Sequence, residues 1–219
     1  MPRNAVFVVA LSVVSTLAAP CHSWASPPAQ HLMCVVDGVE LYVPLRDFDL
    51  PMLLRRSLLY TPRDTLRDGW PWFGAVRDYL QNGKPARRHY GIDIYGDSLV
   101  VLAAADGVVT ALGRGKQWGG SIRLQHNDSL TTLYVHLSRF LTYRGAQIKR
   151  GEPIAVITAP EGNAADTQLH FGLIRNSLFV DPVPFIKRTH RCDAIIQQLL
   201  NEYEHCKLQH SLPPQPVLR

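Results

Sequence analysis

The sequence is poor in the features that define several large classes of protein. Only 19% of its 219 residues are charged, whereas 46% are hydrophobic, which is the wrong balance for a disordered chain. It has four cysteines and no C-x-x-C pair, which argues against a zinc site built from cysteines. The net charge is only +5 and the basic residues form no concentrated stripe, so nucleic acid is not an expected partner.

Several hydrolase and nucleotide-binding motifs are also absent. The chain has no H-E-x-x-H segment, and residues 113–116 (GRGK) do not complete a P-loop. Residues 96–100 (GDSLV) begin like a nucleophile elbow but lack its final glycine and the strand–turn–helix setting that such an elbow needs. A hydrolase that depends on one of these motifs is therefore the least favoured functional hypothesis.

The chain has one long apolar run, residues 5–19 (AVFVVALSVVSTLAA), which follows Arg3. A membrane-spanning helix needs about 20 apolar residues, so this run is predicted to be the core of a signal peptide. Small residues near Ala25 place the expected cleavage after that residue. Residues 1–25 are thus an expected signal peptide, with an uncleaved anchor as the alternative, and the exported chain is expected to have no stable membrane span.

Cleavage would leave Cys34, Cys192 and Cys206. The last two are fourteen residues apart on an expected helix, or about 21 Å along its axis, which is too far for a disulfide between them. An oxidising compartment would allow a bridge from Cys34 to either one, with the other thiol left free.

Fifteen glycines and sixteen prolines indicate many turns. Residues 26–86 are expected to be a lead-in segment, with a strand or hairpin around Met33–Val43. Residues 87–186 are expected to form an antiparallel, mainly β unit, because short β-branched runs follow one another too closely for helical crossovers. Residues 187–219 are expected to contain a packing helix, Arg191–Lys207, and a Pro-rich tail. The predicted strands are Leu99–Ala103, Gly107–Leu112, Ser121–Gln125, Leu130–Val135, Pro153–Thr158 and Gln168–Ile174.

Within the β unit, His89 and Asp93 have an H-x-x-x-D spacing. On a straight strand their side chains would point the same way but stand about 13 Å apart, too far to share an ion. Gly91 allows a sharp bend that brings both onto one cation. Taken alone, the pair is explained equally well as hydrogen-bonded residues at a strand end.

Two further segments place polar residues at strand spacing. Gln168 and His170 are two apart, so they share one face of a strand while Leu169 faces the core. Tyr134 and His136 are predicted to share a face in the same way. Each histidine alone is read as an ordinary sheet residue. Together, two histidines and one aspartate form a three-ligand set with a fourth position for water, which is typical of catalytic zinc.

The stretch from His89 to Phe171 resembles the lysostaphin-type (LytM-like) zinc metallopeptidases, which cut peptide cross-bridges of bacterial cell walls. The resemblance covers about 100 of the 219 residues and rests on several motifs in the family's order. The matching segments are HYGID (89–93), VLAAADGVVTALG (101–113), IRLQH (122–126), TLYVHL (132–137) and QLHF (168–171).

This resemblance implies an antiparallel β-sandwich of the lysostaphin type, which is duplicated-hybrid-like, and one zinc ion. It implies that His89, Asp93 and His170 are the metal ligands and that His136 is a catalytic histidine. His126 matches a position that does not bind the metal, so a structural role is expected for it.

Gln168 is a departure from the family, whose last motif is H-x-H. In the family the first histidine of that motif works beside the metal-bound water with the equivalent of His136. Glutamine cannot take up a proton, although its amide can donate a hydrogen bond to an oxyanion. If the replaced histidine acts mainly as a general base, its loss costs about 10²–10⁴ in rate. Gln168 is therefore a catalytic-site residue that puts catalytic competence in question.

Two functional hypotheses follow from the resemblance. The first is a zinc metalloendopeptidase that hydrolyses peptide bonds of peptidoglycan. The second is a catalytically impaired zinc-binding relative that regulates another cell-wall hydrolase or binds wall peptides. The presence of all three ligands favours metal binding in either case. An exported protein of this kind is expected in the periplasm or associated with the cell envelope.

Two features beside the motif remain open. Arg87 and Arg88 either attract the carboxylates of stem peptides or form a solvated strand edge. The rings of Trp70, Trp72 and Phe73 either line or cap a substrate groove or pack in the core.

Overall fold

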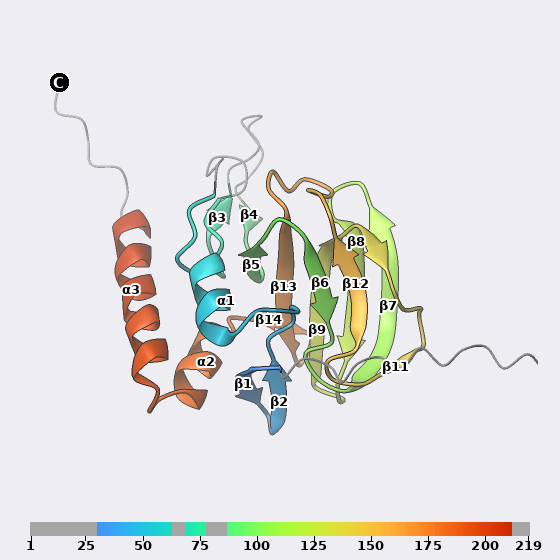
Figure 1. The fold of residues 1–219 in the computed structure, drawn as a ribbon, viewed down its shortest axis with the longest axis horizontal. Coiled ribbons are helices and arrows are strands. Elements are labelled where there is room, and N and C mark those ends of the chain that lie inside the picture. Colours follow the sequence, from blue (N-terminus) through green and yellow to red (C-terminus); the bar gives the residue numbers. More distant parts are fainter. Residues whose placement is uncertain (1–29, 63–68, 78–86, 212–219) are drawn as a thin grey trace, which may run out of the picture.

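The computed structural model describes residues 30–62, 69–77 and 87–211. The expected signal peptide, residues 1–25, and the last eight residues of the Pro-rich tail lie outside the described residues. Strands contain more of the described residues than helices do, and three helices lie together on one side of the sheets (Figure 1). The predicted mainly β, antiparallel fold class is therefore confirmed.

Seven strands form the larger sheet, in the order β11–β7–β8–β9–β13–β14, and β5 also pairs with β13. The strands β5 and β14 pair with successive halves of β13, and every pairing in this sheet is antiparallel. Hence β13 has a partner strand on both sides over most of its length, from His170 onward. The strands are β5 (Ile92–Tyr95), β7 (Gly107–Gly115), β8 (Gly119–Gln125), β9 (Leu130–Leu137), β11 (Gln147–Ile148), β13 (Gln168–Arg175) and β14 (Leu178–Val180).

A smaller sheet of three strands has the order β10–β12–β6. These strands are β6 (Leu99–Leu102), β10 (Arg139–Phe140) and β12 (Pro153–Ile157). The Tyr134 hydroxyl of β9 accepts a hydrogen bond from the Ala104 amide at 3.0 Å, just beyond β6, and thus joins the two sheets. Burial raises the pKa of that hydroxyl to about 12. Apolar side chains of both sheets form one buried cluster that includes Ile122, Leu124, Ile154, Ile157, Leu169 and Phe171.

The expected lead-in segment packs directly on this β unit. It contains the hairpin β1 (Leu32–Val36) and β2 (Val39–Tyr42), the helix α1 (Leu50–Arg56) and the short strand β3 (Val76–Arg77), which pairs with β4 (Arg87–Arg88). Between β2 and α1, Leu45 forms a bridge with Val101, so the lead-in extends the edge of the smaller sheet at β6. The predicted strand or hairpin near Met33–Val43 is confirmed, whereas α1 was not predicted.

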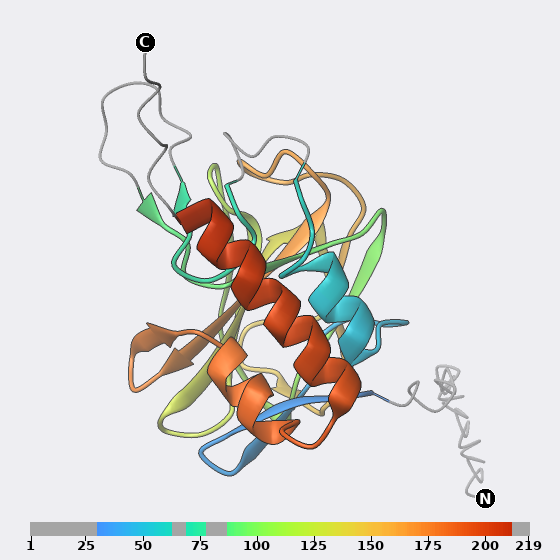
Figure 2. The ribbon, with the colours of Figure 1, turned by 90° about the vertical axis from the view of Figure 1, so that its left-hand side faces the viewer.

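Helices α2 (Val183–Thr189) and α3 (Ala194–Ser211) follow the last strand. Figure 2 shows α3 crossing one side of the molecule next to α1 and α2. The predicted helix Arg191–Lys207 begins three residues too early and ends four too early. Its buried face is largely as predicted, with Ile196, Leu199, Leu200 and Tyr203 in the core, but Ile195 is 61% exposed. The strands end with β14 at Val180, and the prolines at 182 and 184 follow at the start of α2, where proline is tolerated.

The expected disulfide from Cys34 is wrong, because the three cysteines of the described chain are free thiols. Cys34 is completely buried in β1, and this burial raises the pKa of its thiol to about 12. Cys192 is exposed and lies before the first residue of α3 rather than on the helix as predicted, while Cys206 is half-buried on α3. No disulfide therefore joins the cysteines of the described residues.

The six predicted strands of the β unit all correspond to observed strands, with ends that differ by at most three residues. The alternation of buried and less buried residues at the start of β9 shows why such runs form strands: every second side chain enters the core. This alternation ends at Tyr134, two residues before the candidate catalytic residue His136.

Candidate metal centre

His89, Asp93 and His170 converge in the structure. His89 Nε2 is 2.8 Å from His170 Nδ1 and 3.2 Å from Asp93 Oδ1, and His170 Nδ1 is 2.9 Å from Asp93 Oδ1. Asp93 and His170 are direct partners in the register of β5 and β13, so their side chains share one face of the sheet. His89 lies just before β5 and approaches the same point. All three residues are buried.

Gly91 makes this convergence sterically possible. A Cβ atom at this position would stand 2.6 Å from the Phe171 carbonyl oxygen and 2.7 Å from the ring of His170. Contacts under 3.0 Å require something to move, so only glycine lets the chain turn from His89 into β5 this close to β13. The bend predicted at Gly91 is therefore present, and its reason is the close approach of His170.

The loop at residues 69–74 holds His89 and Asp93 through its backbone. The Trp72 carbonyl oxygen lies 2.9 Å from His89 Nδ1, and the Asp93 amide donates to the Pro71 carbonyl at 2.9 Å. Because a carbonyl can only accept, Nδ1 of His89 carries the hydrogen. In the neutral ring Nε2 then carries the lone pair and faces Asp93 and His170. This is the tautomer that a metal ligand requires.

The donor set fits zinc. Tetrahedral zinc with bonds of about 2.0–2.1 Å to nitrogen or oxygen places its ligand atoms about 3.3–3.4 Å apart. The three separations of 2.8, 2.9 and 3.2 Å fall within a few tenths of an ångström of that value. Two imidazole nitrogens and one carboxylate oxygen are ligands that zinc accepts, and three protein ligands are the number found in catalytic zinc sites.

His136 lies beside this cluster because of a β-bulge. The pairing of β8 with β9 shifts by one residue between Gly120–Leu137 and Ser121–Val135, so His136 is the extra residue. Its φ is +66°, which is a left-handed conformation that non-glycine residues rarely adopt. The ring centroids of His136 and His170 are 6.3 Å apart. The bulge therefore re-aims His136 toward the metal centre.

This bulge contradicts the prediction that Tyr134 and His136 share a face. Tyr134 pairs with Phe171, and their rings lie 5.5 Å apart in the core, whereas His136 lies on the side of His170. Regular alternation would apply only to an unbroken strand. The carbonyl oxygen of Glu161 accepts from His136 Nδ1 at 2.9 Å, so the neutral ring of His136 carries its lone pair on Nε2.

Gln168 lies two residues before His170 on β13 and is 1% exposed. Its predicted face is supported by the register, because Gln168 pairs with Tyr95 just as His170 pairs with Asp93. Among the described residues, its Oε1 atom has no hydrogen-bond partner. A buried acceptor without a donor is costly and is found mainly where a functional role compensates.

His126 lies outside the cluster. Its Nδ1 atom is 2.7 Å from the Asp106 carbonyl oxygen and its Nε2 atom is 2.8 Å from the Thr132 hydroxyl. Burial lowers the pKa of the ring, so the neutral form is favoured. Both nitrogens are engaged within the sheet, which agrees with the structural role expected for this residue.

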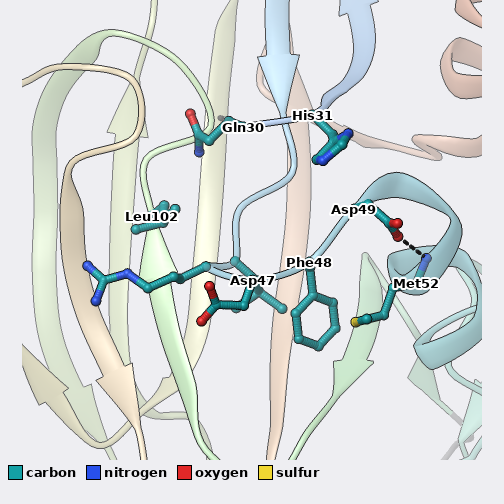
Figure 3. Close-up of a pocket in the computed structure, with 9 residues that line it drawn as sticks. Gln30, His31, Asp47, Phe48, Asp49, Met52 and Leu102 are labelled. Carbon is teal, nitrogen blue, oxygen red and sulfur yellow. Dashed lines mark hydrogen bonds between the residues drawn. The ribbon is translucent and has the colours of Figure 1, made fainter. Parts of the chain in front are cut away.

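A pocket of about 280 Å³ lies elsewhere, between the lead-in segment and β6. Figure 3 shows Asp49 of this pocket capping α1, with its carboxylate accepting from the Met52 amide. None of the candidate site residues lines the pocket. Its lining consists of Gln30, His31, Leu45, Arg46, Asp47, Phe48, Asp49, Met52 and Leu102.

No sequence pattern indicates which carbonyl groups orient the candidate site. Pro71, Trp72 and Glu161 act through backbone oxygens, and a backbone oxygen is present whatever the side chain is. Of the aromatic residues whose role was open, Trp72 is buried and packs in the core. Arg88 is exposed in β4.

No helix in the described part of the chain is both long enough and apolar enough to cross a membrane.

Comparison with known proteins finds a family match and relatives for the β unit. A model of peptidase family M23 matches residues 87–182, which contain His89, Asp93, His136, Gln168 and His170. DD-carboxypeptidase/endopeptidase Mpg of Neisseria meningitidis serogroup B is 35% identical over 98 residues, which are 44% of this chain and 22% of that protein. Murein hydrolase activator NlpD of Escherichia coli is 30% identical over 128 residues, which are 58% of this chain and 32% of that protein.

The chain thus spans only about a fifth to a third of the length of these curated relatives. Among solved structures, the catalytic domain of lysostaphin from Staphylococcus simulans is 26% identical, with a TM-score of 0.46. That alignment covers 53% of this chain and 89% of the lysostaphin chain. The matched range, residues 87–182, contains the candidate ligands His89, Asp93 and His170. The chain therefore contains a domain of peptidase family M23, which spans residues 87–182.

Proposed function

We propose that this protein is a zinc metalloendopeptidase that hydrolyses peptide bonds of bacterial cell-wall peptidoglycan. The observation that carries the proposal is the meeting of His89 Nε2, Asp93 Oδ1 and His170 Nδ1 within 3.2 Å of one another, with His136 beside them. Bound zinc would supply Lewis-acid polarisation of the scissile carbonyl and a nucleophile from water near neutral pH. These three side chains would hold one ion.

His136 is the proposed proton carrier. Because Glu161 fixes the hydrogen on Nδ1, Nε2 of the neutral ring can take up a proton, and the resulting imidazolium can stabilise negative charge on a tetrahedral intermediate. Gln168 shares the face of His170 and cannot take up a proton, but its amide can donate a hydrogen bond to an oxyanion. Proton transfer would therefore depend on His136 alone.

The substrate class is proposed from the relatives. One relative is named a DD-carboxypeptidase/endopeptidase, which points to peptide bonds. Another is named a murein hydrolase activator, which points to the cell wall. Together the two names support wall peptides as the proposed substrate class. We place the protein outside the cytoplasm, in the periplasm or at the cell envelope, after removal of a signal peptide at residues 1–25. Residues 87–186 would then be the peptidase-like domain, flanked by residues 26–86 and 187–219.

A second candidate function is regulation of another cell-wall hydrolase by a chain that binds zinc but cuts slowly or not at all. Gln168 favours it, because a site without a second proton acceptor loses about 10²–10⁴ in rate if the base is essential. The name of the NlpD relative, an activator, points the same way.

Metal analysis of the purified protein tests the site first. Wild type should carry one zinc per chain, whereas His89→Ala and His170→Ala should carry almost none. His31→Ala removes an exposed histidine outside the site and should keep the zinc. If wild type holds no more zinc than the two site variants, both proposed functions fail.

Turnover of defined cross-linked muropeptides, supported by clearing of a gel that contains cell-wall material, separates the two functions. The endopeptidase predicts product release that disappears in His136→Ala while zinc is retained. The regulator predicts no product from wild type and a gain of activity in Gln168→His. Activity that persists unchanged in His136→Ala would contradict the role given to that residue.

A further inference from the structure

Segments from both sides of the M23 domain meet at Trp72, whose carbonyl oxygen lies 2.9 Å from His89 Nδ1. Trp72 precedes residues 87–182, and Tyr203 on α3 follows them. Their rings pack edge to face with centroids 6.0 Å apart, and both side chains belong to the buried core. Trp70 of the same loop stacks on Trp72 at 4.8 Å, and its ring lies in a tilted arrangement 4.0 Å from that of His210, near the end of α3. The tryptophan rings of the loop at residues 69–74 thus pack against side chains of helix α3.

That loop is tied to the metal centre by several hydrogen bonds. The Trp72 carbonyl accepts from His89 Nδ1 at 2.9 Å, and the Gly74 amide donates to the His89 carbonyl at 2.7 Å. The Pro71 carbonyl accepts from the Asp93 amide at 2.9 Å. Two of the three candidate ligands are therefore positioned by a loop whose rings are packed against α3.

We propose that α3, acting through Tyr203 and Trp72, positions His89 for metal binding, so that this helix sets the zinc affinity of the site. The inference rests on the proposed zinc site. Tyr203 is a positioning residue: it acts through the Trp72 backbone and touches neither metal nor substrate. A loop that loses the Tyr203 ring can relax, and the Trp72 carbonyl then no longer holds the His89 ring in one orientation.

The expected size of the effect follows from other metal sites. Loss of a group that orients a metal ligand typically weakens metal binding by about 10–100-fold. The helix contributes no ligand of its own, so the three donors remain present when Tyr203 is changed. The site should therefore bind zinc more weakly without losing its stoichiometry.

The test compares three variants of the full chain. Tyr203→Ala removes the ring that contacts Trp72. Tyr203→Phe keeps the ring and removes only a buried hydroxyl that has no hydrogen-bond partner among the described residues. Leu199→Ala creates a comparable core defect on the same helix, where the buried Leu199 side chain is lost. Zinc affinity is measured by competition with a chelator, and the visible spectrum of the Co²⁺-substituted protein reports ligand geometry.

The proposal predicts that Tyr203→Ala raises the zinc Kd about 10–100-fold and changes the Co²⁺ spectrum. Tyr203→Phe and Leu199→Ala should keep the wild-type Kd and spectrum. Equal weakening in Tyr203→Ala and Leu199→Ala would overturn the proposal, because general destabilisation would explain both. An unchanged Kd in Tyr203→Ala would overturn it as well, while the zinc site itself would stand.

Two controls complete the design. If Tyr203→Ala does not fold, Tyr203→Leu replaces it in the same measurements, since leucine keeps an apolar side chain in the core but no ring against Trp72. If wild type binds no zinc at all, the proposed site and the role of α3 fail together, and this result is distinct from a failure confined to the Tyr203 variants.

Discussion

Asp93 and His170 face each other directly across β5 and β13, with Asp93 Oδ1 2.9 Å from His170 Nδ1. The carboxylate is completely buried, and an uncompensated buried charge is costly. Its position between two imidazole nitrogens is explained by a shared cation or proton.

Replacement of Asp93 by asparagine should separate charge from shape. Asp93→Asn keeps the size of the side chain but removes its negative charge, so zinc affinity should fall by on the order of 100-fold or more. This loss is larger than the loss of about 10–100-fold expected when a residue that only orients a ligand is replaced. Isothermal titration with zinc measures this. Asp97→Asn, at an exposed position after β5, is the matched control and should bind zinc like wild type. Equal affinity in Asp93→Asn and wild type would remove Asp93 from the ligand set.

Gly91 should tolerate no side chain. In Gly91→Ala the new Cβ would meet the Phe171 carbonyl and the His170 ring under 3.0 Å, so the free energy of unfolding should fall by about 1–3 kcal/mol and zinc binding should weaken. Gly113→Ala is the control, because a Cβ there meets nothing within 4 Å. Urea denaturation measures both variants. Similar stability for the two would show that β5 and β13 are not packed as described.

His136 should carry a conformational cost that glycine relieves. At φ +66° a non-glycine residue is disfavoured by about 1–2 kcal/mol, so His136→Gly should be more stable than His136→Ala by about 1 kcal/mol. This order is the reverse of that expected within a regular strand. Both variants should retain zinc and lose hydrolysis. A more stable alanine variant would contradict the bulge.

Much of the fold could be predicted from the sequence, because the six main strands each have β-branched residues and a clear alternation or apolar run. The helix α1 was missed because it has only seven residues and contains a proline, too short for a periodic signal. The start of α3 was placed too early because Cys192 fits the helical period, although it is exposed and lies before the helix.

The candidate ligands could be identified by their motif, but the way they are held could not. Spacing alone left His89 and Asp93 far apart on a straight strand, and the bend at Gly91 depends on the close approach of His170, which lies 77 residues after Asp93 in the sequence. The bulge at His136 is likewise a property of the β8–β9 pairing. Long-range contacts of this kind leave no trace in local periodicity.

Alkaline pH should weaken the fold through Cys34. Its pKa is raised from 9.0 to about 12 by burial, so the unfolded chain releases this proton at lower pH than the folded chain. The contribution of Cys34 to stability is thus complete below about pH 9 and is lost as the pH rises toward 12, by about 1.4 kcal/mol per unit. The stability difference between wild type and Cys34→Ala, followed by urea denaturation, should shrink above pH 9. A constant difference up to pH 11 would contradict the burial of this thiol.

A crystal structure of the zinc-loaded protein, with data collected at the zinc absorption edge, tests the metal centre most directly. We expect one anomalous peak at about 2.0–2.2 Å from His89 Nε2, Asp93 Oδ1 and His170 Nδ1 together. Zinc bound at any other group of side chains, or crystals that contain zinc with no peak among these three atoms, would contradict the proposed site.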